Sequence, residues 1–221
     1  MSARGRDDGR RTAPQSGVIV LAGEDQNDCE IMAALIRAHR PDLCTTSKLV
    51  RINDPVRLRR KSGDDLATAV KVLTGKARAK ARQQKARLTG FVVHEDLDAF
   101  TGSDYGRVRK VITDELGRQE DGFRTALALA AWESEGWLLL FPEAFPRVRP
   151  RWRVPVQLRG RDSGRIKKPK QELKNRLGTP LFRESDGPLV ARKALEHGLI
   201  PAPEGTNGSY ADFVGDLKKW S

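Results

Sequence analysis

The sequence is poor in the residues that define several classes of protein. It has only two cysteines in 221 residues, and the spacing of Cys29 and Cys44 fits neither a disulfide framework nor a cysteine metal cluster. No apolar run approaches the roughly 18 residues that a membrane-spanning helix needs. Residues 1–16 lack the apolar core of a signal peptide. We therefore expect a cytoplasmic protein with no membrane partner.

Several catalytic motifs are also missing. The chain has no phosphate-binding loop of the Walker type, no GxGxxG, no GxSxG and no Ser/His/Asp order. Its three histidines, His39, His94 and His197, show no metal-binding spacing. These absences argue against a dinucleotide-dependent enzyme and a serine hydrolase, and any role driven by nucleotide hydrolysis would need a partner chain.

Acidic charge is in deficit. The chain has 41 Lys and Arg against 29 Asp and Glu, which gives a formal net charge of +12. Such a balance favours an anionic partner, with nucleic acid first and an acidic membrane surface second. The alternative is compositional drift, because a chain rich in Arg and Ala is typical of a GC-rich genome.

Apolar periodicity predicts an α/β fold with a mainly parallel sheet. Three short apolar runs predict strands, a weaker pattern predicts another, and amphipathic stretches predict helices between and after them. The expected strands are 17–23, 43–52, 90–93 and 123–131; the expected helices are 25–40, 64–88, 102–118, 133–141, 169–177, 187–197 and 209–220. We expect a disordered basic tail over 1–16 and one domain over 17–221, with a basic loop or insertion over 142–170 and a helical C-terminal part over 171–221.

Carboxylates follow three of these apolar runs. They are Glu24 and Asp28, Asp96 and Asp98, and Glu133 and Glu135. If the strands are parallel neighbours, their carboxyl ends share one crevice and the acids converge there. Clustered carboxylates repel one another unless a cation neutralises them, and oxygen ligands favour Mg²⁺ or Mn²⁺. For Asp28 the alternative is compensation of a helix dipole.

These motifs resemble those of a known family. Gly23-Glu24 with Asp28, followed by Asp96-Leu97-Asp98, resembles the Toprim domain of topoisomerases, bacterial primases and the overcoming-lysogenization-defect nucleases. Residues 133–139 resemble the Glu-x-Glu-x-Trp-Leu signature of a compact bacterial Toprim-like family, and 168–173 and 185–189 look similar to its downstream blocks. The resemblance covers most of residues 17–220. Asp25 departs from the pattern, because Toprim proteins usually have Gly after the first Glu.

The resemblance implies chemistry on phosphodiesters with Mg²⁺ or Mn²⁺. In it Glu24 is the general base or a metal ligand, Asp96 and Asp98 are the main metal ligands, Glu133 or Glu135 completes the shell and Asp28 supports it. His94 and Glu95, which precede Asp96, offer an additional ligand. The resemblance also implies an anti-phage or mobile-element setting beside an ATPase partner protein.

Basic segments supply candidate contacts to nucleic acid. Lys167, Lys168 and Lys170 surround Pro169, a natural first residue of a helix, where backbone N–H groups and lysines both favour a phosphate. The alternative is a solvated loop. Trp152, in the basic stretch 147–165, is a candidate stacking platform. Residues 76–87 predict a solvated helix that is basic on all faces, with contact to a nucleic-acid backbone as the alternative.

Together these features predict a metal-dependent nuclease. The alternatives are a nucleic-acid-binding module without catalysis, a non-catalytic subunit of an ATPase complex and a toxin-like effector that acts on RNA.

Overall fold

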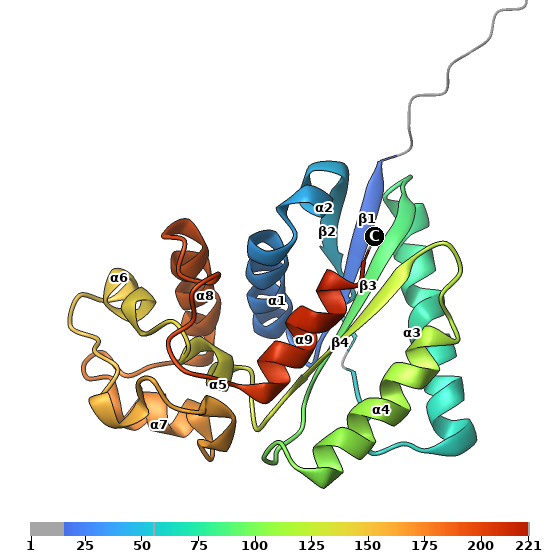
Figure 1. Ribbon diagram of the computed structural model, residues 1–221. Helices are drawn as coiled ribbons and strands as arrows, with labels where there is room; N and C mark the ends of the chain where they lie inside the picture. Colours follow the sequence, from blue (N-terminus) through green and yellow to red (C-terminus); the bar gives the residue numbers. More distant parts are fainter. Residues whose placement is uncertain (1–15, 55, 221) are drawn as a thin grey trace, which may run out of the picture.

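A four-stranded parallel sheet forms the centre of the molecule (Figure 1). The computed structural model describes residues 16–54 and 56–220, so the expected tail lies almost wholly outside the described residues. The strands are β1 (Gly17–Ala22), β2 (Ser47–Arg51), β3 (Arg87–Asp96) and β4 (Arg124–Ala130), in the order β2-β1-β3-β4. All three strand pairs are parallel, as the sequence predicts. The order places β1, β3 and β4 side by side.

Helices cover both faces of the sheet. On one face lie α1 (Gln26–His39) and α9 (Gly208–Lys218), and on the other lie α3 (Gly63–Gln83) and α4 (Ser103–Gly117) (Figure 1). Strand side chains alternate between these two cores. In β3, Val92 enters the α1 and α9 core, whereas Phe91 and Val93 enter the α3 and α4 core. This alternation later decides which acids can meet.

A helical lobe follows β4 and leads back to α9. It comprises α5 (Glu135–Leu138), η1 (Pro142–Ala144), α6 (Phe145–Val148), η2 (Val156–Leu158), η3 (Ser163–Arg165), α7 (Pro169–Arg176), η4 (Glu184–Asp186) and α8 (Gly187–Glu196). Helix α8 packs on α1. The helix expected over 133–141 is thus only the short α5, whereas the three C-terminal helices are confirmed within one or two residues.

The segment 142–170 is more ordered than the sequence suggests, and the proposed role of Trp152 is wrong. Trp152 is fully buried, its ring lies against Phe182 at 5.8 Å between centroids, and its indole N–H donates to the Pro180 carbonyl at 2.6 Å. An aromatic ring enclosed in this way cannot stack on an external base.

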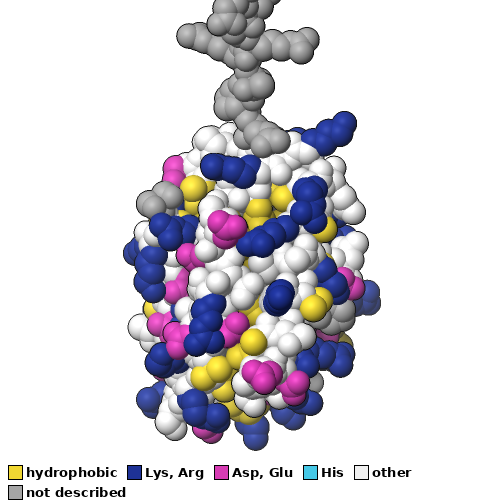
Figure 2. All heavy atoms as spheres, turned by 90° about the vertical axis from the view of Figure 1, so that its right-hand side faces the viewer, with side chains coloured by type: hydrophobic (Ala, Val, Ile, Leu, Met, Phe, Trp, Pro, Cys, Tyr) yellow, Lys and Arg dark blue, Asp and Glu magenta, His cyan; other side chains and the backbone are white. Residues whose placement is uncertain are grey.

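Two further boundaries differ from expectation. The helix expected over 64–88 ends at Gln83, because Lys85 takes a positive φ of 51° and β3 begins at Arg87. The first half of the expected strand 43–52 is instead the short helix α2 (Pro41–Thr46), which begins at a proline in the first turn. Lys and Arg on the α3 and α4 face are interspersed with acidic and apolar side chains and form no continuous patch (Figure 2).

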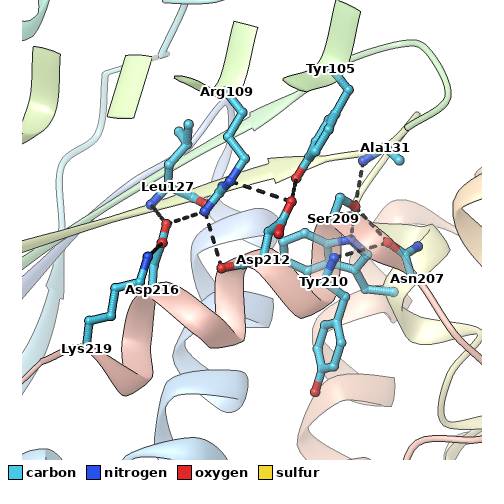
Figure 3. A network of polar contacts seen from close by, with 11 residues as sticks. Tyr105, Arg109, Leu127, Ala131, Asn207, Ser209, Tyr210, Asp212, Asp216 and Lys219 are labelled. Carbon is cyan, nitrogen blue, oxygen red and sulfur yellow. Dashed lines mark hydrogen bonds and ion pairs between the residues drawn. The ribbon is translucent and has the colours of Figure 1, made fainter. Parts of the chain in front are cut away.

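Side chains close the outer edge of β4. The Leu127 N–H donates to Asp216 of α9 at 3.3 Å, and Arg109 of α4 donates to the Leu127 carbonyl at 2.9 Å (Figure 3). The N–H of Ala131 donates to the Ser209 hydroxyl at 2.9 Å. These groups stand where a fifth strand would pair, so the edge offers few free backbone groups.

The group that holds this edge is called the Arg109 cluster and consists of Tyr105, Arg109, Asp212 and Asp216. Arg109 lies 2.5 Å from Asp216, and the Tyr105 hydroxyl donates to Asp212 at 2.8 Å (Figure 3).

Among the described residues, no helix is long and apolar enough to cross a membrane.

Candidate metal centre

The first acids lie where β1 passes into α1. Asp25 caps α1: its side chain accepts the Asp28 N–H at 3.0 Å, and the Asp28 carboxylate accepts the Asp25 N–H at 3.3 Å. This reciprocal cap fixes Asp28 in the first turn, over the carboxyl end of the sheet. Glu24, one residue earlier, accepts the Asp96 N–H at 3.3 Å. The helix-capping alternative for Asp28 is therefore real, but it does not exclude a second role.

The second role is visible at His94. This residue points from β3 into the α1 side of the sheet, with its Nδ1 3.6 Å from Asp28 Oδ2 and its Nε2 3.4 Å from Asp96 Oδ1. Both distances are long for hydrogen bonds. Neither ring nitrogen, although buried, has a hydrogen-bond partner among the described residues. Asp28, His94 and Asp96 each offer one ligand atom, and these three atoms lie within 4.8 Å of one another. We call these three residues the Asp-His-Asp group.

Ser134 completes the surroundings of this group. Its hydroxyl donates to Asp28 Oδ1 at 2.9 Å and its backbone N–H donates to Asp96 Oδ1 at 3.0 Å. A residue from the turn after β4 therefore orients both carboxylates. The carboxyl ends of the strands β1, β3 and β4 meet at this group, which is the arrangement that the sequence predicts for acids that follow parallel strands.

The electrostatics of the group are unbalanced. Burial, and then the charge of Asp96, raises the pKa of Glu24. Burial is also the main reason that the pKa of Asp28 is raised, with His94 opposing it. For His94, burial alone would lower the pKa, but the charge of Asp28, the direct contact with the Asp96 carboxylate and the charges of Asp96 and Glu24 together raise it to about 9. Burial disfavours the ionised form of these carboxylates around the His94 ring, and a bound divalent cation would favour it.

The group could hold a metal ion. Its donors are carboxylate oxygens and an imidazole nitrogen, a set that suits several divalent metals. Unpartnered, buried nitrogens on His94 fit this use, because each nitrogen faces one aspartate. One nitrogen can bind a metal together with Asp96 while the other keeps its contact with Asp28, which is the usual way that proteins orient a ligating histidine.

Glu95 and Asp98 take other roles in the structure. Glu95 points to the opposite face of β3 and accepts the N–H groups of Leu58 at 2.7 Å and of Arg59 at 3.1 Å. Arg59 then donates to the Asp96 carbonyl and to Asp98, the latter at 2.5 Å. Asp98 lies beyond the end of β3 with a positive φ of 58°, so it does not share the extended register of Asp96. It lies beside the Asp-His-Asp group, paired with an arginine.

Glu133 and Glu135 belong to the junction with α7. Glu133 accepts the backbone N–H of Lys170 at 3.0 Å, so a carboxylate of the protein itself takes a position where the sequence suggests a bound phosphate. Glu135 is buried, and burial raises its pKa to about 8 although Lys170 opposes the shift. The Lys170 ammonium lies 3.9 Å from Glu135 and 3.1 Å from Glu184.

The three candidate lysines therefore differ. Lys170 is engaged with acids, Lys167 lies 5.9 Å from the centroid of the Trp132 ring, and Lys168 lines a cavity of about 820 Å³. This cavity also reaches Asp98 and Glu133. Glu24 and Asp25 line a separate, smaller cavity of about 240 Å³.

The sequence does not give three participants their full weight. It offers His94 only as an additional ligand beside the Asp-x-Asp pair, because a histidine on a buried strand gives no spacing signal. Arg59 comes from a loop far away in sequence, and Ser134 stands between two glutamates that drew attention instead. Alternation along β3 is the one signal available, since it places residues 94 and 96 on one face and 95 on the other.

Comparison with protein-family models, with curated proteins and with solved structures finds no match. The chemistry of the site itself therefore carries the function that we propose.

Proposed function

We propose that this chain is a metal-dependent phosphodiesterase that acts on nucleic acid, with a Toprim-like site. The observation that carries the proposal is the Asp-His-Asp group, which lies with Glu24 at the carboxyl ends of two adjacent parallel strands. This is the position at which open α/β sheets bind their ligands. The net charge of +12 supports an anionic substrate.

Asp96 and His94 would hold the metal, with Asp28 orienting the imidazole and Glu24 adjoining the site. Mg²⁺ or Mn²⁺ are the ions we propose, and the imidazole donor makes Mn²⁺ the better fit of the two. When bound, such an ion would polarise a phosphoryl oxygen and lower the pKa of bound water.

The residues of the chain have distinct tasks in this proposal. Glu24, exposed just beyond the end of β1, is placed to accept a proton from an attacking water. Glu135, with its pKa raised to about 8, holds a proton at neutral pH and can donate it to a leaving oxygen. Arg59 anchors Asp98 and the backbone of Asp96, which keeps the loop after β3 in one position.

The test is cleavage of plasmid DNA, single-stranded DNA and total RNA in the presence of Mg²⁺, Mn²⁺ or EDTA. Wild type should cleave at least one substrate with metal and none with EDTA, and Asp96→Asn should lose about a hundredfold or more of the activity. Asp121→Asn is the matched control, because Asp121 is 88% exposed and precedes β4 at the opposite end of the sheet.

The outcomes separate the candidates. Cleavage of RNA alone would identify an RNA-targeting effector. Metal-independent cleavage, or equal activity in Asp96→Asn and Asp121→Asn, would refute the proposal. Salt-sensitive binding with no cleavage under any condition would favour a binding module or a subunit that works beside an ATPase.

A further inference from the structure

The cavity of about 820 Å³ beside the metal centre is built unlike the rest of the surface. It lies between the loop after β3, the turn after β4, helix α7 and the segment 181–184. Four residues other than glycine have a positive φ in the described part of the chain, and three of them, Asp98, Trp132 and Lys168, line this cavity. For a tryptophan this conformation is a genuine outlier. Strained backbone of this kind gathers at ligand sites, where the fold holds it in place.

The cavity has an excess of unpaired basic side chains. Its acids are already engaged: Asp98 with Arg59, Glu133 with the N–H of Lys170, and Glu184 with the ammonium of Lys170. By contrast, Lys168, Lys174 and Arg183 also line the cavity, and their cationic groups form no ion pair with an acid among residues 16–54 and 56–220. Three unpaired basic side chains around one cavity favour an anion there.

The cavity also has an aromatic and apolar wall. Trp132 is half-buried and lines the cavity; its indole N–H is enclosed without a hydrogen-bond partner among the described residues, and the Lys167 ammonium lies over its ring, 5.9 Å from the centroid. Phe100 packs edge-on against this ring at 5.1 Å between centroids, which fixes its orientation. Leu181, 57% exposed, and Phe182 extend the apolar lining.

We infer that this cavity binds an unpaired nucleotide of a nucleic-acid strand, with the base against Trp132 and the adjoining phosphates against Lys168, Lys174 and Arg183. The inference rests on the proposed function, since it identifies the substrate of that site as single-stranded. The base must be unpaired, because in a duplex its faces are covered by the neighbouring bases. Asp98, two residues after Asp96, lines the cavity, so the next phosphodiester of a strand bound there would lie toward the Asp-His-Asp group.

The experiment measures binding separately from cleavage. Fluorescence anisotropy in EDTA follows a labelled strand of about 12 nucleotides, the same strand in a duplex, and competition by adenosine 5′-monophosphate. Wild type and Asp96→Asn should bind the strand about tenfold or more tightly than the duplex. Lys168→Ala/Lys174→Ala should lose about tenfold in affinity.

The matched control is Lys48→Ala/Lys71→Ala, which removes the same charge from exposed positions outside the cavity and should change the affinity less than about threefold. Trp132→Leu should lose about tenfold, whereas Trp132→Phe keeps a stacking ring and should retain most of the affinity. Thermal unfolding of each variant shows whether it is folded, and if Trp132→Leu is not, the two lysine pairs and Trp132→Phe decide.

Equal affinity for strand and duplex, equal losses in the two lysine pairs, or tighter binding of the free nucleotide than of the strand would each overturn the inference. Strand binding that behaves as expected, without cleavage under any metal, would instead refute the proposed catalysis and leave the nucleotide site in place.

Discussion

The Arg109 cluster and the Asp-His-Asp group both contain buried carboxylates, and these are satisfied to different degrees. In the Arg109 cluster, Asp216 accepts from Arg109 at 2.5 Å, from the Leu127 N–H at 3.3 Å and from Lys219 at 3.1 Å. In the Asp-His-Asp group, the cationic partner that the two aspartates have among the described residues is His94, at 3.4 and 3.6 Å, and it makes no hydrogen bond. Both groups anchor helices to the sheet. The second group leaves charge uncompensated within the described part of the chain, which is typical of a ligand-binding site.

The largest effect is expected from breaking the satisfied cluster. Arg109→Met would remove the buried cationic partner of Asp216, whose side chain is 7% exposed, and leave it the exposed ammonium of Lys219, so it should lower the free energy of unfolding by about 3 kcal/mol. Urea denaturation measures this change. Arg109→Met/Asp216→Leu should recover part of the loss, because no buried charge then remains. A loss below about 1 kcal/mol for the single variant would show that this cluster does not hold α9 to the sheet.

A metal should stabilise only the unsatisfied group. At a Mn²⁺ concentration of about 100 times its dissociation constant, the wild-type free energy of unfolding should rise by about 2.7 kcal/mol. Differential scanning fluorimetry with and without EDTA detects this as a rise in melting temperature. Asp96→Asn should show little of the rise, whereas Asp121→Asn should show all of it. Equal stabilisation of both variants would locate the metal elsewhere.

Neutralising one aspartate in each group should have opposite consequences. The pKa of Asp28 is raised, chiefly by burial, so its ionised form is disfavoured in the folded protein at neutral pH. Asp28→Asn should therefore leave the free energy of unfolding within about 1 kcal/mol of wild type, or raise it, while metal binding is lost. Asp216→Asn removes the charge that Arg109 needs and should destabilise the protein. If Asp28→Asn is the more damaging of the two in urea, the comparison between the groups fails.

Sequence reasoning succeeds where the physics is local or periodic. Apolar runs and the acids that follow them place Glu24, Asp28 and Asp96 together, because parallel strands share a carboxyl edge and the order β2-β1-β3-β4 makes β1 and β3 neighbours. That order itself is not written in any one segment of the chain.

Sequence reasoning fails where the packing of distant segments determines the position of a side chain. Asp98 leaves the extended register because Arg59, from a loop 39 residues earlier, pairs with it. The Glu133 carboxylate accepts an N–H in the first turn of α7, 37 residues later. The helix N-terminus that the sequence offers to a phosphate is therefore occupied by a carboxylate of the chain. Burial of Trp152 follows from the fold of the lobe, since a basic and proline-rich neighbourhood gives no sign of an enclosed ring.

The smallest effect concerns His39, which is half-buried, and His94, which is buried; their pKa values move in opposite directions. His39, at the end of α1, bonds the hydroxyl of Tyr210 in α9 at 2.7 Å, and burial, with the nearby charge of Lys218, lowers its pKa below 6.5. Protonation of His39 therefore destabilises the folded protein. The contribution of neutral His39 to stability is present above pH 6.5 and is lost as the pH falls through the pKa of His39 in the folded state. His94, with its pKa raised to about 9, has the opposite sign, and its contribution is lost as the pH rises from 6.5 through 9.

Urea midpoints of wild type and His39→Gln, measured in EDTA at about pH 5.5 and pH 7.5, separate the two residues, because the substitution leaves the His94 contribution unchanged. The midpoint difference between the two proteins should be smaller at the lower pH, where wild type loses the contribution of neutral His39. A difference that stays constant or grows on acidification would mean that His39 is charged in the fold. It would then resemble His94, and burial would not be the force that sets its pKa.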